Sequence, residues 1–440
     1  MKKMKFYSTL LVLTLCTTLL QNVTTYAKEL EQQTSKQIEQ EKQVTEEVIK
    51  ARQEDLETLV KELKSKHPNM YHKNKEEVFN KKMDEIKSKL STMSDLDFSI
   101  AISEYVALIG DSHTKASIGA VFGSKVHTLP MNMKQVKEGL LITATFKEHQ
   151  DILGGLLVSI NGISMEEIKQ KIMPMISYDN EVYLNRQFVG TFYIYEILNY
   201  YGILDKPQDI SMEIMVDGKV KTVKMDAVGE ETIDGKEIVK LEVPIAKTAR
   251  DTSKIYFYKP LDDKTLYIQY NACQEDEKLP METFAKQVDE AITQYKYEHV
   301  VVDLRNNVGG SDGVIMPLLN VLQEKKEKDQ IKIDTLIGEN TFSSALINAV
   351  MLKEIGSTMV GTPTGGSVDH FGSVSSFELP NCGVKIQYSN KFIDLSKYFE
   401  AAKDYNVESF KPDILVEQTR ENYLKGEDAV INTVLLNKEE

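Results

Sequence analysis

The sequence predicts a multidomain protein whose main domain is of the α/β class, with a mostly parallel sheet covered by helices. Three observations predict it. The chain has 440 residues, more than one hydrophobic core ordinarily organises. From residue 254 onward, strand-like runs rich in Val and Ile alternate with amphipathic helical segments. Before that region, residues 51–110 show helical periodicity, and residues 127–225 show short strands separated by glycine turns.

The N-terminal 27 residues have the parts of a secretory signal peptide. Three lysines precede an apolar run from Phe6 to Leu20, and a cleavage site is expected after Ala27. The run is too short to span a bilayer comfortably. Residues 28–50, rich in Glu, Gln, Lys and Thr, are predicted to be a solvated tether. We therefore expect an exported, extracytoplasmic protein, either secreted or held at the cell surface or in the periplasm.

The charge balance is strongly acidic. The formal net charge is −14, and removal of the signal segment, which carries three lysines and no acid, leaves −17. Such a surface repels nucleic acid and anionic lipid, so neither is an expected partner. No segment after the signal peptide reaches membrane-spanning length, so no integral membrane segment is expected in the mature chain.

The sequence offers little support for a metal or another cofactor. It has no cysteine–histidine cluster, no HExxH motif and no EF-hand pattern. After signal cleavage only Cys273 and Cys382 remain. An exported protein meets oxidising conditions, so the two could pair, but two partly buried free thiols fit the sequence equally well.

Residues 51–125 are predicted to form a helical domain ending in the motif GDSHT. Apolar residues recur at helical spacing in three stretches. The third helix is expected to begin at Ser94, with Asp97 completing a partial capping box, and to stop at Gly110. That helix delivers the chain to Asp111-Ser112-His113-Thr114.

Residues 126–250 resemble a PDZ-like module with an insertion-like stretch at 226–250. The segment ILGGLLVSINGISMEEI supplies a strand, a turn and the start of a helix expected over 165–175. Modules of this kind bind extended peptides by adding a strand to a sheet edge.

The α/β pattern occupies the domain predicted at 251–440. Its expected helices are 281–295, 313–323 and 343–355, and its expected strands are 254–258, 265–270, 299–304, 331–337, 358–361, 373–379 and 383–389.

A nucleophile is predicted where the strand at 331–337 leads through a turn into the motif TFSSA. Ser344 would stand at a helix N-terminus, where the Ala345 amide can donate to a developing oxyanion. A second donor would be the amide of Gly309 or Gly310, in VVVDLRNNVGG at 300–310. The alternative is that Ser343 merely caps the helix.

Asp303, Arg305 and Asn306 also follow the strand at 299–304. Charged groups at a buried strand end commonly hold neighbouring loops through charge-assisted hydrogen bonds. We therefore expect these three residues to be architectural.

The expected general base is His113, because Ser112 and Thr114 supply hydroxyls and Asp111 a carboxylate that could orient its imidazole. A histidine after a helix end is often only a partner of the helix dipole. The main rival is His370, which follows the glycine turn at 365–366.

Together these motifs resemble the tail-specific (C-terminal-processing) serine peptidase superfamily, which includes the tricorn protease core. DLRNNVGG, TFSSA and VGTPTGG occur in the expected order, and GDSHT and the PDZ-like module precede them. The resemblance implies an α/β core shared with crotonases and the ClpP protease. It also implies Ser344 as the nucleophile and Gly309, Gly310 and Ala345 as oxyanion-hole residues.

One departure selects between subtypes of that superfamily. Many bacterial members use a serine–lysine dyad, but Ser367 stands where the lysine is expected. The resemblance is therefore closer to the tricorn-core arrangement, which implies Ser112 and His113 upstream and a glutamate near the C-terminus. Glu408 is the nearest candidate for that glutamate, with Glu400 behind it.

The sequence thus predicts an exported serine endopeptidase-like protein that cleaves peptides or unfolded tails through an acyl-enzyme, without a cofactor. A catalytically silent protein that binds peptides or small ligands on the same scaffold is the alternative. Hydrolysis of a non-peptide ester or amide by the same nucleophile is a third possibility.

Overall fold

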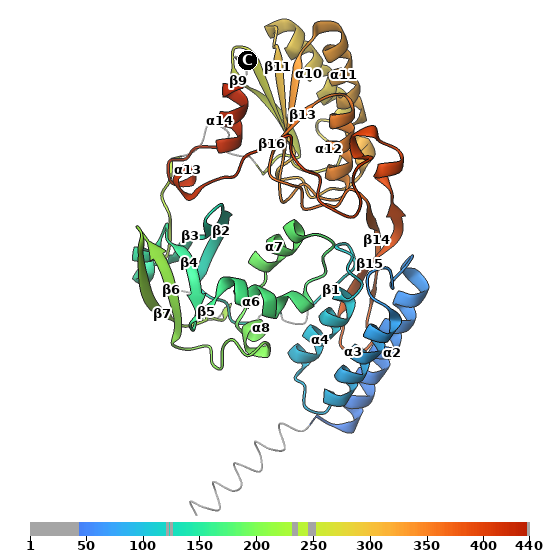
Figure 1. Ribbon diagram of the computed structural model, residues 1–440, viewed down its shortest axis with the longest axis vertical. Helices are drawn as coiled ribbons and strands as arrows, with labels where there is room; N and C mark the ends of the chain where they lie inside the picture. The colour runs from blue at the N-terminus through green and yellow to red at the C-terminus, as the bar shows by residue number, and fades with distance from the viewer. Residues whose placement is uncertain (1–43, 120–122, 124–125, 231–235, 245–251, 438–440) are drawn as a thin grey trace, which may run out of the picture.

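The computed structural model describes residues 44–119, 123, 126–230, 236–244 and 252–437 (Figure 1). The predicted signal peptide and residues 28–43 of the predicted tether lie outside these ranges. The rest of the tether is not a tether, because helix α2 begins at Glu46, where Thr45 caps it by accepting from the Val48 amide. No helix in the described ranges is long and apolar enough to cross a membrane.

Three helices form the N-terminal domain, as the periodicity predicts: α2 (Glu46–Lys66), α3 (Glu76–Lys89) and α4 (Asp95–Ala107). Helix α4 begins with the expected capping box, in which Ser94 and Asp97 satisfy each other's backbone amides. Its C-terminal end leads through Gly110, at φ 72°, into the GDSHT motif.

The second part is a β-rich module. Its seven-stranded sheet has the order β2-β3-β4-β6-β7, with β5 beside β4 and β8 beside β3. Strand β8 comes from the insertion-like stretch, which therefore belongs to the sheet. The expected strand, turn and helix at 156–172 are present, while the PDZ-like identity of the module stays a prediction. The bounds are β2 (Met131–Val136), β3 (Gly139–Phe146), β4 (Leu156–Ile160), β5 (Ile163–Ser164), α6 (Met165–Ile172), α7 (Glu181–Val189), α8 (Tyr195–Tyr200), β6 (Ile210–Val216), β7 (Lys219–Met225) and β8 (Ile238–Lys240).

The third part is the α/β core, whose six-stranded sheet has the order β16-β13-β12-β11-β10-β9. All neighbouring strands run parallel except β9, which is antiparallel to β10. Its elements are those that the sequence predicted over residues 254–361, with the helix expected over 313–323 found over 316–329, and three at 414–436 that the sequence analysis did not predict. They are β9 (Tyr256–Asp262), β10 (Thr265–Tyr270), α10 (Met281–Tyr295), β11 (His299–Asp303), α11 (Met316–Asp329), β12 (Lys332–Ile337), α12 (Ser344–Glu354), β13 (Thr358–Gly361), β16 (Ile414–Leu415), α13 (Arg420–Leu424) and α14 (Ala429–Leu436).

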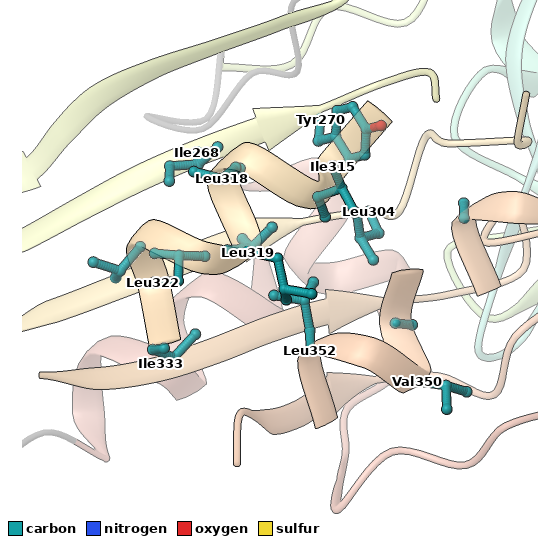
Figure 2. Packing of buried hydrophobic residues seen from close by; sticks show 14 of the residues in the cluster. Ile268, Tyr270, Leu304, Ile315, Leu318, Leu319, Leu322, Ile333, Val350 and Leu352 are labelled. Atoms are coloured by element: carbon teal, nitrogen blue, oxygen red, sulfur yellow. The ribbon is translucent and has the colours of Figure 1, made fainter. Parts of the chain in front are cut away.

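Helices cover both faces of this sheet. Helices α10, α11 and α12 bury one face, where leucines of α11 such as Leu318 and Leu322 lie near Ile268 and Ile333 of the strands (Figure 2). Helix α14 buries the other face through Val430, Ile431 and Val434. Burial on both faces explains why the strands read as continuous apolar runs.

The last two predicted strands leave the core. Strands β14 (His370–Glu378) and β15 (Lys385–Ile393) form a hairpin that reaches the helical domain (Figure 1). There β15 pairs with β1 (Lys115–Ser117), which directly follows GDSHT. The tip is held by Asp55 of α2, whose carboxylate accepts from the amides of Asn381 and Cys382, both at 2.9 Å. The hairpin thus ties the helical domain to the core.

Candidate active site

Ser344 is the first residue of α12, immediately after the carboxyl end of β12 and its turn. The preceding residue, Ser343, has φ 53° and ψ −127°, a conformation that costs about 1–3 kcal/mol for a residue with a Cβ. Its side chain makes no capping hydrogen bond, so the helix-cap interpretation of this serine is wrong. A strained strand-to-helix turn commonly presents a nucleophile in hydrolases, and here the serine that it presents is buried.

The glycine turn after β11 lies directly against this serine. The Ser344 hydroxyl donates to the Gly310 carbonyl oxygen at 2.8 Å. A Cβ on Gly309 would lie 2.9 Å from the Ser343 Cβ and 3.0 Å from the Phe342 oxygen, so only glycine allows this approach. The fold therefore brings the two motifs at 300–310 and 341–345 together.

The expected oxyanion donors are not equally available. The Gly309 amide donates to the Asn307 side chain at 2.9 Å, and the Ala345 amide donates to the Phe342 oxygen at 3.1 Å. The Gly310 amide has no acceptor among the described residues. The Gly309 oxygen accepts from the Cys273 amide. In the trans peptide between Gly309 and Gly310, the C=O and N–H point in opposite directions, so the Gly310 N–H points away from Cys273.

His113 lies buried beside the residues that precede Ser344. Its ring stacks on Phe342, with centroids 4.4 Å apart, and on His370 at 5.3 Å. Its Nε2 has no hydrogen-bond partner among the described residues, and its Nδ1 lies 3.4 Å from the Ser112 hydroxyl oxygen. Burial, together with the nearby His370, lowers its pKa to about 3, so this imidazole is neutral at ordinary pH. No hydrogen bond between described residues joins His113 to Ser344.

The hairpin holds His113 in this position. Gln387 of β15 donates to the His113 carbonyl at 2.8 Å, and the Ser389 amide donates to the Thr114 hydroxyl at 3.0 Å. Asp111 accepts from the His113 amide at 2.8 Å and from the Ser389 hydroxyl at 2.7 Å. Burial opposes ionisation of Asp111, but hydrogen bonds from its neighbours, His67 foremost, hold its pKa below the usual value.

An acidic residue that the sequence did not single out also contacts this cluster. Asp179, just before α7, accepts from the Ser112 hydroxyl at 2.8 Å. Burial raises the pKa of this carboxyl to about 6, although the Ser112 hydrogen bond opposes the rise. Asp179 and Asn180 look like ordinary residues before a helix, and Asn180 does cap α7. Nothing in the sequence links this turn to a motif 67 residues upstream.

The turn that carries Asp179 also contacts Ser367, which stands where the lysine is expected. Ser367 is buried, and its hydroxyl accepts from the Asn180 side chain at 2.8 Å. The same Asn180 amide donates to the Gly365 oxygen at 3.0 Å. The neighbourhood of Ser367 is therefore buried and hydrogen-bonded, while the choice between the serine–histidine and serine–lysine arrangements stays a prediction.

The two C-terminal glutamates do not join the cluster. The Glu408 carboxylate pairs with Lys411 at 3.3 Å, and that of Glu400 pairs with Lys403 at the surface. Only the Glu408 backbone lies near the site, because its oxygen accepts from the Val368 amide at 2.8 Å. The structure thus does not bring the Glu408 side chain to His113, and Asp179 occupies the acidic position beside Ser112.

His370 shares the environment of His113. Its Nδ1 lies 3.2 Å from the Val368 oxygen, so it carries the proton and leaves Nε2 as a buried nitrogen with no partner among the described residues. Burial also lowers the pKa of this imidazole. The rival base is therefore next to the site, with its ring stacked on that of His113.

Asp303 and Arg305 form a structural network, as expected. The Arg305 guanidinium donates to Asp303 at 2.7 and 3.0 Å and to Asp428 at 2.8 and 2.9 Å. Asp428 also caps α14 by accepting from the Val430 and Ile431 amides. This bidentate arrangement fastens α14 to the end of β11.

The described residues contain no group of three or more His, Cys, Asp or Glu side chains that could hold a metal ion. The two cysteines are not paired. Cys273 is buried in the α/β core, whereas Cys382 packs against the helical domain at the hairpin tip. Burial raises the pKa of each thiol to about 12.

A groove of about 740 Å³ separates the β-rich module from the core. Residues 134–137 of the module line one side, and residues 305–306 and 337–340 at the carboxyl ends of β11 and β12 line the other. The C-terminal segment at 416–430 closes one side. Grooves at the carboxyl ends of parallel strands commonly bind ligands.

Comparison with solved structures shows that the chain shares the fold of mature CPAF. A structure of mature CPAF complexed with lactacystin matches with a TM-score of 0.62 and 14% identity, over 89% of this chain and 99% of that chain. A CPAF point mutant gives 0.62 and 13%, over 89% and 98%. The photosystem II D1 C-terminal processing protease matches with a TM-score of 0.39 and 10% identity, over 88% and 99%. No protein-family model and no curated protein sequence matches the chain.

Proposed function

We propose that this protein is a serine-type peptidase that forms an acyl-enzyme on Ser344. The observation that carries the proposal is the convergence of three separate segments on one buried point. They are the strained turn that presents Ser344, the Gly309–Gly310 turn, and the GDSHT segment with its buried, unpartnered imidazole nitrogen. A fold shared with mature CPAF over nearly the whole length of both chains supports it.

The chemistry follows from the hydrogen bonds of Ser112. Its hydroxyl donates to Asp179, so its oxygen can accept a proton donated by His113 Nδ1. That interaction fixes the tautomer in which Nε2 keeps its lone pair. Nε2 then takes the Ser344 proton as the hydroxyl oxygen attacks the carbonyl carbon, and returns it to the leaving amine. Water, activated the same way, hydrolyses the acyl-enzyme and releases the serine.

Catalysis requires a rearrangement from the resting contacts. The Ser344 hydroxyl must exchange its bond with the Gly310 carbonyl for one with an imidazole nitrogen. Gly310 N–H is the available donor for the oxyanion, and Ala345 N–H can join it once it releases Phe342. We infer that a bound substrate drives this change by occupying the space beside the glycine turn.

Peptides or unfolded protein tails are the proposed substrates. An extended chain can lie in the groove between the module and the core, where backbone groups and polar side chains of both domains are available. The predicted signal peptide supports an exported, extracytoplasmic location.

A catalytically silent binding protein is the second candidate. The observation that favours it is the resting state itself, in which the nucleophile's proton and two of the three expected oxyanion donors already have partners. In that case the same groove would hold a peptide without cleaving it.

A serine-reactive phosphonate probe distinguishes these functions. We expect stoichiometric labelling of the wild type, loss of labelling in Ser344→Ala, and retention in the matched neighbour Ser343→Ala. Labelling should fall strongly in His113→Ala and persist in His370→Ala. An unlabelled wild type that binds peptides would instead establish the silent protein, and loss only in His370→Ala would make His370 the base.

A further inference from the structure

Two cations near the site have no acidic partner in the part of the chain that the structure describes. Lys115 of β1 and Arg186 of α7 are both partly buried, and neither forms an ion pair with any described residue. The sequence from 115 to 126 contains no Asp or Glu. Partial burial of a positive charge without a counter-ion is energetically costly, which distinguishes this pair from an exposed lysine.

The two charges lie close enough to affect each other. Burial, and next the positive charge of Arg186, lower the pKa of Lys115 below its usual value. The Arg186 guanidinium lies 5.9 Å from the centre of the Tyr183 ring. An anion between the cations would relieve both the burial cost and the repulsion.

Lys115 also lines a cavity of about 320 Å³. The cavity lies between β1, α4, α7 and α8, and most of its surface is apolar. Its polar lining includes Ser103, Ser177 and the Tyr183 side chain. An apolar pocket with one cation and a few hydroxyls suits a small acidic group carried on an aliphatic stem.

A stack of aromatic rings connects this cavity to the proposed catalytic residues. Tyr183, in the cavity wall, stacks on Phe342 with centroids 4.8 Å apart. Phe342 in turn stacks on His113 at 4.4 Å. Lys115 is also only two residues after His113 along the chain. In this stack, the Phe342 ring alone stands between the Tyr183 ring of the cavity wall and the imidazole of the proposed base.

We propose that Lys115, assisted by Arg186, binds a carboxylate of the substrate peptide and so makes this cavity a specificity pocket. The inference rests on the proposed peptidase function and adds a substrate class to it: peptides with a carboxylate near the cleaved bond. That carboxylate is either an acidic side chain or the free C-terminus of the peptide.

The first test measures binding without catalysis. Glutarate and its uncharged analogue glutaramide are titrated into the wild type by calorimetry. We expect glutarate alone to bind, and about tenfold to a hundredfold weaker binding in Lys115→Met and in Arg186→Met, the range for loss of a charge-assisted hydrogen bond. Lys115→Arg should retain binding, which separates charge from folding, and Lys171→Met is the matched surface control. Equal glutarate affinity in wild type and Lys115→Met would overturn the inference.

The second test identifies the source of the carboxylate. A peptide library with free or amidated C-termini is digested, and cleaved bonds are mapped by mass spectrometry. Enrichment of Asp and Glu near the cleaved bond supports a side-chain carboxylate, and a requirement for the free terminus supports the other source. Either preference should disappear in Lys115→Met. Cleavage that ignores both would refute the specificity pocket and leave the peptidase intact, whereas glutarate binding without any cleavage or labelling would refute the peptidase alone.

Discussion

Replacing Asp179 with Asn tests whether this carboxylate acts on His113 through Ser112. Asn keeps the shape and can still accept from the Ser112 hydroxyl, but it removes the negative charge. Loss of a charge-assisted hydrogen bond is worth about 1.5–3 kcal/mol, which corresponds to roughly a tenfold to hundredfold slower reaction. The measured quantity is the second-order rate constant of phosphonate labelling.

The pH dependence makes the test specific. The pKa of Asp179 is raised to about 6, whereas that of His113 is lowered to about 3. The labelling rate of the wild type should therefore fall about tenfold per pH unit below about pH 6, following protonation of Asp179 and not of His113. Asp179→Asn should be slower and flat over that range. A variant that keeps both the wild-type rate and the limb near pH 6 would refute this reasoning.

Asp179→Asn should slow labelling but stabilise the fold. Because the folded-state pKa of Asp179 is raised, the fold binds this proton more tightly than the unfolded chain does, and Asp179 destabilises the fold as pH rises from about 4 through about 6. The shift sets a ceiling of about 3 kcal/mol, which partial exposure of the residue as a whole reduces. Relative to the wild type, Asp179→Asn should gain stability over that interval in urea unfolding.

Three further substitutions test the supports of the site. Gly309→Ala places a Cβ 2.9 Å from the Ser343 Cβ and should abolish labelling, while Gly313→Ala, whose Cβ meets no neighbour, should leave it unchanged. Asp428→Ala leaves part of the Arg305 charge unpaired and removes a helix cap, so unfolding free energy should drop by about 3–5 kcal/mol, measured in urea. Asp55→Ala frees the hairpin tip and should cost about 1–3 kcal/mol and slow labelling; unchanged labelling would show that the hairpin does not position His113.

Much of the fold was predictable because local patterns and long-range packing agree. Helix 281–295 and strand 358–361 were predicted with their observed bounds, since their apolar residues recur at helical spacing or form a short bounded run. The capping box at Ser94 and Asp97 was equally readable. The sequence did not show which sheet the strands after residue 369 would join, because strand patterning alone does not specify the partner sheet.

The nucleophile and the glycine turn of the site were predictable, but the acidic residue beside them was not. Ser344 and the glycine turn follow neighbouring parallel strands, whose carboxyl ends must meet at one edge of the sheet. Glu408 was selected by its distance along the chain, and its side chain points instead to Lys411. Asp179 was missed because it comes from the β-rich module, and only the packing of that module places it beside Ser112.

The sequence by itself determined the α/β core, the helical domain and the strand–turn–helix that presents Ser344, since periodicity, caps and glycines act over a few residues. Only the tertiary structure decided what surrounds His113. The hairpin at 370–393, the turn at Asp179 and the stack through Phe342 come from three different parts of the chain. The physical reason is that burial sets the pKa of a base and the charge of its neighbours, and burial is a property of the assembled domains.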